Sequence, residues 1–124
     1  MKHAIVILSD PKPGSDEATA RVLNALAFAD ECSRCGDEFD VVFAGAGTRW
    51  PAELTRLDHP GRERFENIRE HVRGASRSCA ARNGATESVQ AAGVPLLADN
   101  AVPNTAGVAS LRRYYAEGWH VTLF

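Results

Sequence analysis

The stretch HAIVIL, residues 3–8, decides the fold class of this chain. Apolar and mostly β-branched residues follow one another here, without the polar alternation of a half-exposed strand. A continuous apolar run of this length is typical of a strand covered on both faces, as in a parallel sheet. The stretch FDVVFA at residues 39–44 has the same apolar character and predicts a second strand. Such strands need helices on either side of the sheet to bury them.

A long amphipathic helix is predicted between these two strands. Ser15 is a good helix cap, and the acidic Asp16 and Glu17 suit the first turn. The helix should run to about Cys35 and end at Gly36. Its apolar stripe consists of Ala18, Val22, Ala25, Leu26 and Ala29. This spacing gives the helix one buried face.

The remainder of the chain continues the alternation of strands and helices. We expect helices over residues 51–57, 62–73, 84–92 and 105–117, and strands over residues 75–79, 94–98 and 119–124. Gly74 should end the helix over 62–73, which would bury Phe65, Ile68 and Val72. The helix over 105–117 should turn Val108, Leu111 and Tyr115 inward. Pro95 indicates an edge position or a strand start for residues 94–98.

This order of elements predicts an α/β protein. Strands that alternate with helices favour a mainly parallel sheet with helices on both faces. The sheet would have five strands, in a single domain over residues 1–124. We find no internal repeat, linker or low-complexity segment in the sequence.

Composition and charge exclude several classes of protein. The chain is 44% hydrophobic and 24% charged, which is ordinary for a soluble domain. A net charge of −2 without a long basic run argues against a nucleic-acid partner. No apolar stretch approaches membrane-spanning length, and the first apolar run is too short for a signal peptide. Three cysteines cannot pair completely, which favours a reducing compartment, and we expect a cytoplasmic protein.

The stretch GASRSCAARNG, residues 74–84, offers the reactive chemistry of the sequence. Cys79 is expected where a short strand turns into a short helix. Helix-terminal N–H groups and the flanking Arg77 and Arg82 would all favour a thiolate, the nucleophilic form of cysteine. The alternative is a half-buried and inert cysteine, as most free cysteines are.

The predicted topology collects several polar residues near Cys79. Ligands of open α/β sheets bind beyond the carboxyl ends of the strands. Four predicted loops lie at that edge: residues 9–15, 45–50, 79 onward and 99–104. The candidate site residues that these loops add to Cys79 are Asp10, Gly45, Gly47, Arg49, Trp50 and Asn100. The two glycines would admit a ligand to the backbone, although a plain turn is the alternative.

The pair Cys32 and Cys35, in the stretch CSRC, is predicted to lie far from Cys79. The first helix starts at the carboxyl edge, so its end should be about 25–30 Å away along the helix axis. A redox pair would need to lie at a helix start. A zinc site would need further ligands, and the sequence has no second CxxC and no paired histidine motif. We therefore favour incidental or structural cysteines over a surface disulfide, and a surface disulfide over a metal site. We expect no cofactor.

The whole chain resembles the DsrE/DsrF-like family, which includes sulfur-relay subunits of the Tus type. The resemblance lies first in AIVILSD and the helix EATARVLNALAFADEC. The stretch FDVVFAGAG is similar to the second strand of that family and its glycine loop. SCAARNGATESVQAAGVPLL is similar to the segment that carries its strand-end cysteine, and EGWHVTLF fits its last strand.

The resemblance implies a three-layer α/β/α sandwich with a parallel five-stranded sheet. It also implies a homo-oligomer or hetero-oligomer, commonly a trimer or hexamer. In members that handle sulfur, the cysteine at the position of Cys79 carries a persulfide and passes it to a partner protein. We therefore expect a sulfur carrier whose enzyme class would be sulfurtransferase. Its partners would be donor and acceptor proteins. The alternative is a non-catalytic module of the same fold that binds a small ligand or a protein at the carboxyl edge.

Overall fold

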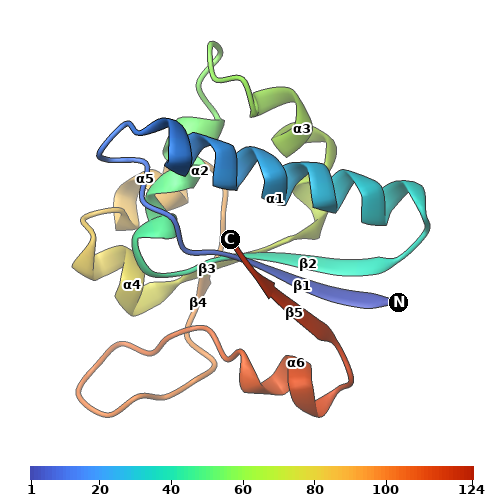
Figure 1. Cartoon of the computed structure of the whole chain (residues 1–124). Helices are drawn as coiled ribbons and strands as arrows, with labels where there is room; N and C mark the ends of the chain where they lie inside the picture. The colour runs from blue at the N-terminus through green and yellow to red at the C-terminus, as the bar shows by residue number, and fades with distance from the viewer.

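A computed structural model, which describes residues 1–124, confirms an all-parallel five-stranded sheet (Figure 1). Its strands stand in the order β4-β3-β2-β1-β5. They are β1 (Lys2–Ile7), β2 (Glu38–Phe43), β3 (Val72–Ser76), β4 (Leu96–Leu97) and β5 (His120–Leu123). The short strand β4 lies at an edge of the sheet, as Pro95 predicts.

The helices cover the two faces of the sheet unequally. Figure 1 shows α1, α2, α3 and α5 on one face, and α6 with the loop before it on the other. Their bounds are α1 (Asp16–Arg34), α2 (Trp50–Leu54), α3 (Arg62–Asn67), α4 (Arg77–Arg82), α5 (Thr86–Ala91) and α6 (Arg112–Ala116). Two short 3₁₀ helices, η1 (Gly45–Arg49) and η2 (Arg69–His71), complete the elements. None of the helices combines the length and the apolar character needed to cross a membrane.

Alternate residues of the strands pack into two hydrophobic cores, one on each face of the sheet. Ile5 and Ile7 of β1 face the large core beneath α1, together with Val41 and Phe43 of β2. Ala4 faces the other side, where the small core also contains Val42 and Tyr114. The period of two in a strand thus divides β1 and β2 between the two layers.

Helix α1 forms as the sequence predicts. The Ser15 side chain accepts a hydrogen bond from the backbone N–H of Ala18 at 3.1 Å. The predicted apolar stripe is buried, and Cys32 extends it by one more turn. Gly36 adopts a φ of +74° just beyond the helix, a conformation that favours glycine.

The predicted helix over residues 62–73 is too long, and the third strand begins earlier than predicted. Helix α3 ends at Asn67, and Val72 already pairs with Val41 of β2. Gly74 lies within β3, where a Cβ atom would stand 2.6 Å from the carbonyl oxygen of Pro95. Glycine is therefore required for the close approach of two chain segments and does not end a helix. Because β3 ends at Ser76, Cys79 is not at a strand end as predicted but lies within α4, three residues beyond the end of β3.

The predicted helix over residues 105–117 is wrong for its first seven residues. The backbone groups of this segment bond to the segment after β4: Val108 exchanges two hydrogen bonds with Asn100, at 2.8 and 3.0 Å. The N–H of Ser110 donates to the Asp99 carboxylate at 3.0 Å. Only Arg112–Ala116 is helical, and it buries Tyr114, whereas Tyr115 is 66% exposed.

A polar cluster fixes α6 on the face of the sheet opposite α1. The Tyr114 hydroxyl donates to Asp40 of β2 at 2.7 Å. The Arg113 guanidinium lies 4.2 Å from the centre of the Tyr114 ring and 3.4 Å from the Asp40 carboxylate. Burial and the Asp40 carboxylate hold the pKa of Tyr114 well above its usual value, so the hydroxyl remains a donor. The hydrogen bond from Tyr114 to Asp40 is thus the main polar attachment of α6 to the sheet.

We predict that Tyr114→Phe lowers the free energy of unfolding by about 1.5–3 kcal/mol, the range for a hydrogen bond to a charged group. Urea denaturation followed by circular dichroism measures this loss. Tyr115→Phe is the matched control, because the Tyr115 side chain is exposed, and it should change stability by less than about 0.5 kcal/mol. Equal effects of the two substitutions would contradict the role given to Tyr114.

Candidate functional site

The loops that follow β1, β2, β3 and β4 meet at the carboxyl edge of the sheet, as the parallel topology requires. The chain leaves β3 through α4 and reaches α5 on the face that carries α1, but it leaves β4 toward α6 on the opposite face. The connections that follow β3 and β4 therefore diverge, and we call this place the β3–β4 junction. Cys79 follows β3 and lies beside this junction.

Hydrogen bonds join the two chain segments at the β3–β4 junction. The N–H of Ser78 in α4 donates to the carbonyl of Gly107 at 2.9 Å. The Ser76 hydroxyl accepts from the N–H of Ala109 at 3.0 Å and does not cap α4. Gly107 is required here, because a Cβ atom would stand 2.9 Å from Ala98. The loop after β4 is thus held against the start of α4.

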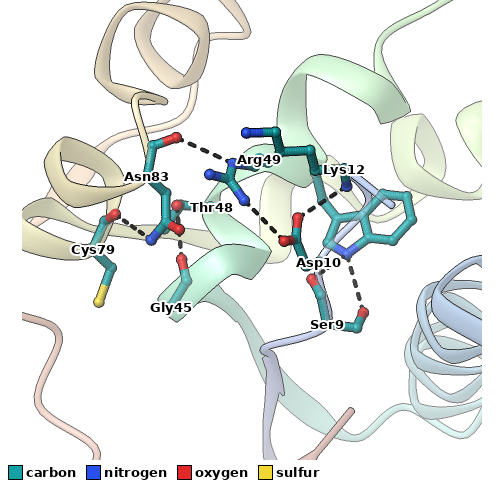
Figure 2. Close-up of polar contacts among 9 residues, drawn as sticks. Ser9, Asp10, Lys12, Gly45, Thr48, Arg49, Cys79 and Asn83 are labelled. Atoms are coloured by element: carbon teal, nitrogen blue, oxygen red, sulfur yellow. Dashed lines mark hydrogen bonds and ion pairs between the residues drawn. The ribbon is translucent and has the colours of Figure 1, made fainter. Parts of the chain in front are cut away.

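A chain of polar contacts connects three of the four loops at this edge (Figure 2). The Asp10 carboxylate pairs with the Arg49 guanidinium at 2.9 Å. Arg49 Nε donates to the Asn83 carbonyl at 3.1 Å, and Asn83 Nδ2 donates to the Cys79 carbonyl at 2.8 Å. The structure therefore brings Asp10 and Arg49 together with the backbone of Cys79.

The electrostatics of Asp10 favour its charged form. Partial burial opposes ionisation, but the backbone N–H of Lys12 and the Arg49 guanidinium outweigh it. Together they hold the pKa of the Asp10 carboxyl below its usual value. The ion pair therefore exists at neutral pH, and Asp10 is not a proton donor there.

Trp50 has a structural role at this edge. Its side chain is 2% exposed, and its indole Nε1 donates to the carbonyl and the hydroxyl of Ser9, at 2.8 and 3.1 Å. The ring of His59 meets it edge-on at 5.9 Å, and His59 Nδ1 accepts from the N–H of Gly61. Trp50 thus anchors the loop after β1 and does not line an open pocket.

The two glycines of the loop after β2 serve packing. A Cβ atom at Gly47 would stand 2.0 Å from the carbonyl oxygen of Ile7, so only glycine lets η1 lie against the end of β1. Gly45 has a φ of +56° and is the first residue of η1. Its carbonyl accepts the Thr48 hydroxyl at 2.8 Å. The predicted loop is an ordered 3₁₀ helix with Gly47 buried.

Cys79 is the third residue of α4 and is half-buried. Figure 2 shows its sulfur directed away from the contacts of Asn83, Arg49 and Asp10. Arg77 and Arg82, on either side of it in α4, are exposed and form no ion pair. A helix of six residues has few aligned peptide groups, so its N-terminal end adds little positive charge at this sulfur.

Asn100 follows β4 and lies at the β3–β4 junction. It is exposed, and its backbone pairs with Val108 in an isolated bridge. It therefore shapes the loop after β4, and its side chain stays outside the contacts of Asp10 and Arg49.

The other two cysteines differ from Cys79. Cys32 is 2% exposed, and Cys35 is exposed at the end of α1. Burial and the nearby carboxylates of Asp37 and Glu31 raise the pKa of the Cys32 thiol. Cys32 is therefore a protonated core residue and not a nucleophile.

Sequence reasoning missed Asn83 and Ser9, which complete the polar contacts. Asn83 stands four residues after Cys79, the spacing that joins neighbours on one helix face. That spacing was the available signal, provided that Cys79 had been placed inside the helix. Ser9 contacts Trp50 across 41 positions of sequence, and no local pattern predicts such a contact.

The carboxyl edge also has a cavity of about 370 Å³ on the side of α1. Its lining includes Leu8, Asp10, Arg21, Leu123 and Phe124. Leu8 and Leu123 are 40% and 58% exposed. Cys79 is not part of this lining.

No family model matches the chain, and no curated protein is similar to it in sequence. Its fold is similar to the solved structure of BT1422, a conserved protein of unknown function from Bacteroides thetaiotaomicron. The TM-score is 0.65, over 99% of this chain and 94% of that one, at 14% identity. At this identity the likeness shows the fold alone.

We predict that Arg49→Lys lowers the free energy of unfolding by about 1–2 kcal/mol. A lysine cannot contact Asp10 and the Asn83 carbonyl in the same fork geometry. Chemical denaturation measures this effect, with Arg82→Lys as the matched control because Arg82 is exposed and unpaired. Arg82→Lys should change stability by less than about 0.5 kcal/mol. A loss of similar size in both variants would contradict the role of Arg49.

We also predict that the effect of Asp10→Asn depends on pH. Because the folded protein lowers the pKa of Asp10, ionised Asp10 stabilises the fold above its unfolded pKa of about 3.9. This contribution is lost as the pH falls through the folded pKa. The stability difference between the unchanged protein and Asp10→Asn should be largest near neutral pH and shrink below about pH 4. Denaturation curves at several pH values test this, and a difference that does not shrink in acid would refute it.

Proposed function

We propose that this protein is a sulfur carrier, in which Cys79 holds a persulfide and passes its outer sulfur to a partner thiol. The observation that carries the proposal is the position of Cys79. It is half-buried at the carboxyl edge of the sheet, its sulfur points away from the polar contacts, and two unpaired arginines flank it. The resemblance of the sequence to DsrE/DsrF-like proteins supports the same chemistry.

The surroundings of Cys79 suit transfer of an anionic sulfur. Arg82 stands three residues after Cys79 and Arg77 two residues before it, and neither is neutralised by a carboxylate. Positive charge favours a thiolate and attracts an anionic persulfide. Two hydrogen bonds to its carbonyl, from Asn83 N at 3.0 Å and Asn83 Nδ2 at 2.8 Å, hold the cysteine backbone in place. The sulfur itself has no hydrogen-bond partner.

The reaction consists of two thiol exchanges. The Cys79 thiolate attacks the outer sulfur of a donor persulfide, a new S–S bond forms, and the donor thiolate leaves. An acceptor thiolate then attacks the outer sulfur on Cys79, and the Cys79 thiolate is released. One sulfur atom moves in each step, and no external oxidant or reductant is needed.

The partners in this proposal are donor and acceptor proteins. Cys79 does not line the cavity of the carboxyl edge, and a sulfur outside a closed pocket suits exchange with another protein. A homo-oligomer is part of the proposal as well, since Leu8 and Leu123 leave exposed apolar surface beside the end of the sheet.

A module that binds a ligand through the same edge is the competing function. The arrangement favours it less, because Asp10, Arg49 and Trp50 bond to groups of the protein itself. Residues that are satisfied internally stabilise loops and leave little capacity for a ligand.

We predict that incubation with glutathione persulfide adds one sulfur atom to Cys79. Peptide mass spectrometry identifies the modified residue, and Cys79→Ser should reduce loading to the background of the reagent. The matched control is Cys35→Ser, which removes the exposed cysteine, retains Cys79 and should load as the unchanged protein does. The proposal would be contradicted if Cys79→Ser still gained the sulfur, or if the added sulfur were found on Cys35.

The role of the arginines is tested in the same assay. Replacing both Arg77 and Arg82 with Ala should slow loading and alkylation of Cys79, because the positive charge near the sulfur is lost. The exposed Arg64 and Arg112 supply a charge-matched control, since their double replacement lowers the net charge equally without touching α4.

A further inference from the structure

Three side chains of metal-ligand type meet at the amino edge of the sheet, opposite the candidate site. His3 comes from β1, Cys32 from the last turn of α1, and Asp37 from the turn before β2. A ring nitrogen of His3, the sulfur of Cys32 and a carboxylate oxygen of Asp37 all lie within 4.8 Å of one another. In Figure 1 the N-terminus and the end of α1 lie on the same side of the molecule, away from α4.

His3 is buried, and one of its two ring nitrogens faces the cluster. The residue is 6% exposed. Nε2 lies 3.3 Å from Asp37 Oδ2, so Nε2 is the nitrogen in position to bind an ion. Nδ1, the other ring nitrogen, has no hydrogen-bond partner within the protein.

We propose that His3, Cys32 and Asp37 form a binding site for a divalent transition metal ion, with Zn²⁺ as the fitting ion. Imidazole, thiolate and carboxylate are the three ligand types that zinc takes in proteins. This proposal is independent of the function proposed for Cys79.

The distances suit a tetrahedral ion. Ligand atoms that lie 2.0–2.3 Å from zinc are about 3.5 Å from one another in a tetrahedron. The pair His3 Nε2 and Asp37 Oδ2, at 3.3 Å, already has this separation. The Cys32 sulfur lies within 4.8 Å of both ligands, so a movement of about 1 Å brings it to the same spacing.

The surrounding contacts leave the ligand atoms available. The Met1 ammonium pairs with Oδ1 of Asp37 at 3.2 Å, while Oδ2 faces His3. Asp37 is partly open to solvent, which leaves a water molecule the fourth position. Cys35 is exposed and lies outside the three-residue cluster, so the stretch CSRC contributes one ligand and not a pair.

Binding exchanges the thiol proton for the metal. The Cys32 S–H bond breaks, a sulfur–zinc bond forms, and one proton is released to the solvent for each ion bound. The neutral imidazole and the ionised carboxylate donate lone pairs without further proton loss. The bound ion would join β1, the end of α1 and the start of β2, and would stabilise the fold.

Titration of the tag-free, metal-stripped protein tests the site. Calorimetry with Zn²⁺ should show one ion per chain and proton release. Titration with Co²⁺ should give the charge-transfer absorption of a thiolate–cobalt bond. Cys32→Ala and Asp37→Asn should each weaken Zn²⁺ binding at least about tenfold, since substitution even of residues that only hydrogen-bond a metal ligand has an effect of that size. Asp37 is partly exposed, so Asp37→Asn keeps the test valid if Cys32→Ala fails to fold.

The control variants are Cys35→Ala and Cys79→Ala, which should bind Zn²⁺ within about twofold of the unchanged protein because neither residue is in the cluster. Absence of Zn²⁺ and Co²⁺ binding by the unchanged protein would overturn the proposal. Equal affinity in Cys32→Ala would do the same. A loss in Cys35→Ala as large as that in Cys32→Ala would assign the ion to the cysteine pair and overturn the three-residue site.

Discussion

The burial of β1 on both faces is the constraint on which the rest of this structure depends. Residues 3–7 are all buried, between β2 on one side and β5 on the other. A strand in this position must place every backbone polar group in the sheet and must be covered from above and below. The connections that provide the cover then fix which loops meet at each end of the strands.

The two ends of the sheet are consequently different in chemistry. At the carboxyl edge, loops from four strands meet, and glycines allow them to approach closely, as Gly47 does against the carbonyl of Ile7. At the amino edge, the end of α1 returns the chain to the start of β2, and Cys32 comes beside His3. Cys79 and Cys32 lie at opposite ends of one fold, so the functions proposed for them are separate.

The layers of the fold were predictable, because apolar periodicity reports burial directly. Strands β1 and β2, the cap at Ser15 and the stripe on α1 depend on local pattern alone. The site was predictable only as a set of loops. The contacts of Asp10 with Arg49 and of Trp50 with Ser9 span 39 and 41 positions of sequence, and no local rule contains them. Gly74 and residues 105–111 were misassigned for the same reason, since distant backbone contacts override their local tendencies.

The placement of Cys79 inside α4 changes how its reactivity must be explained. A cysteine at the start of a long helix is activated by free N–H groups, but α4 has six residues and the N–H of Ser78 already donates to Gly107. The activation that we propose therefore depends on side-chain charge, and Arg77 and Arg82 are the cations of α4. Screening by salt weakens exposed charges over about 10 Å, so a reaction that depends on these arginines should be more salt-sensitive than one that depends on a helix end.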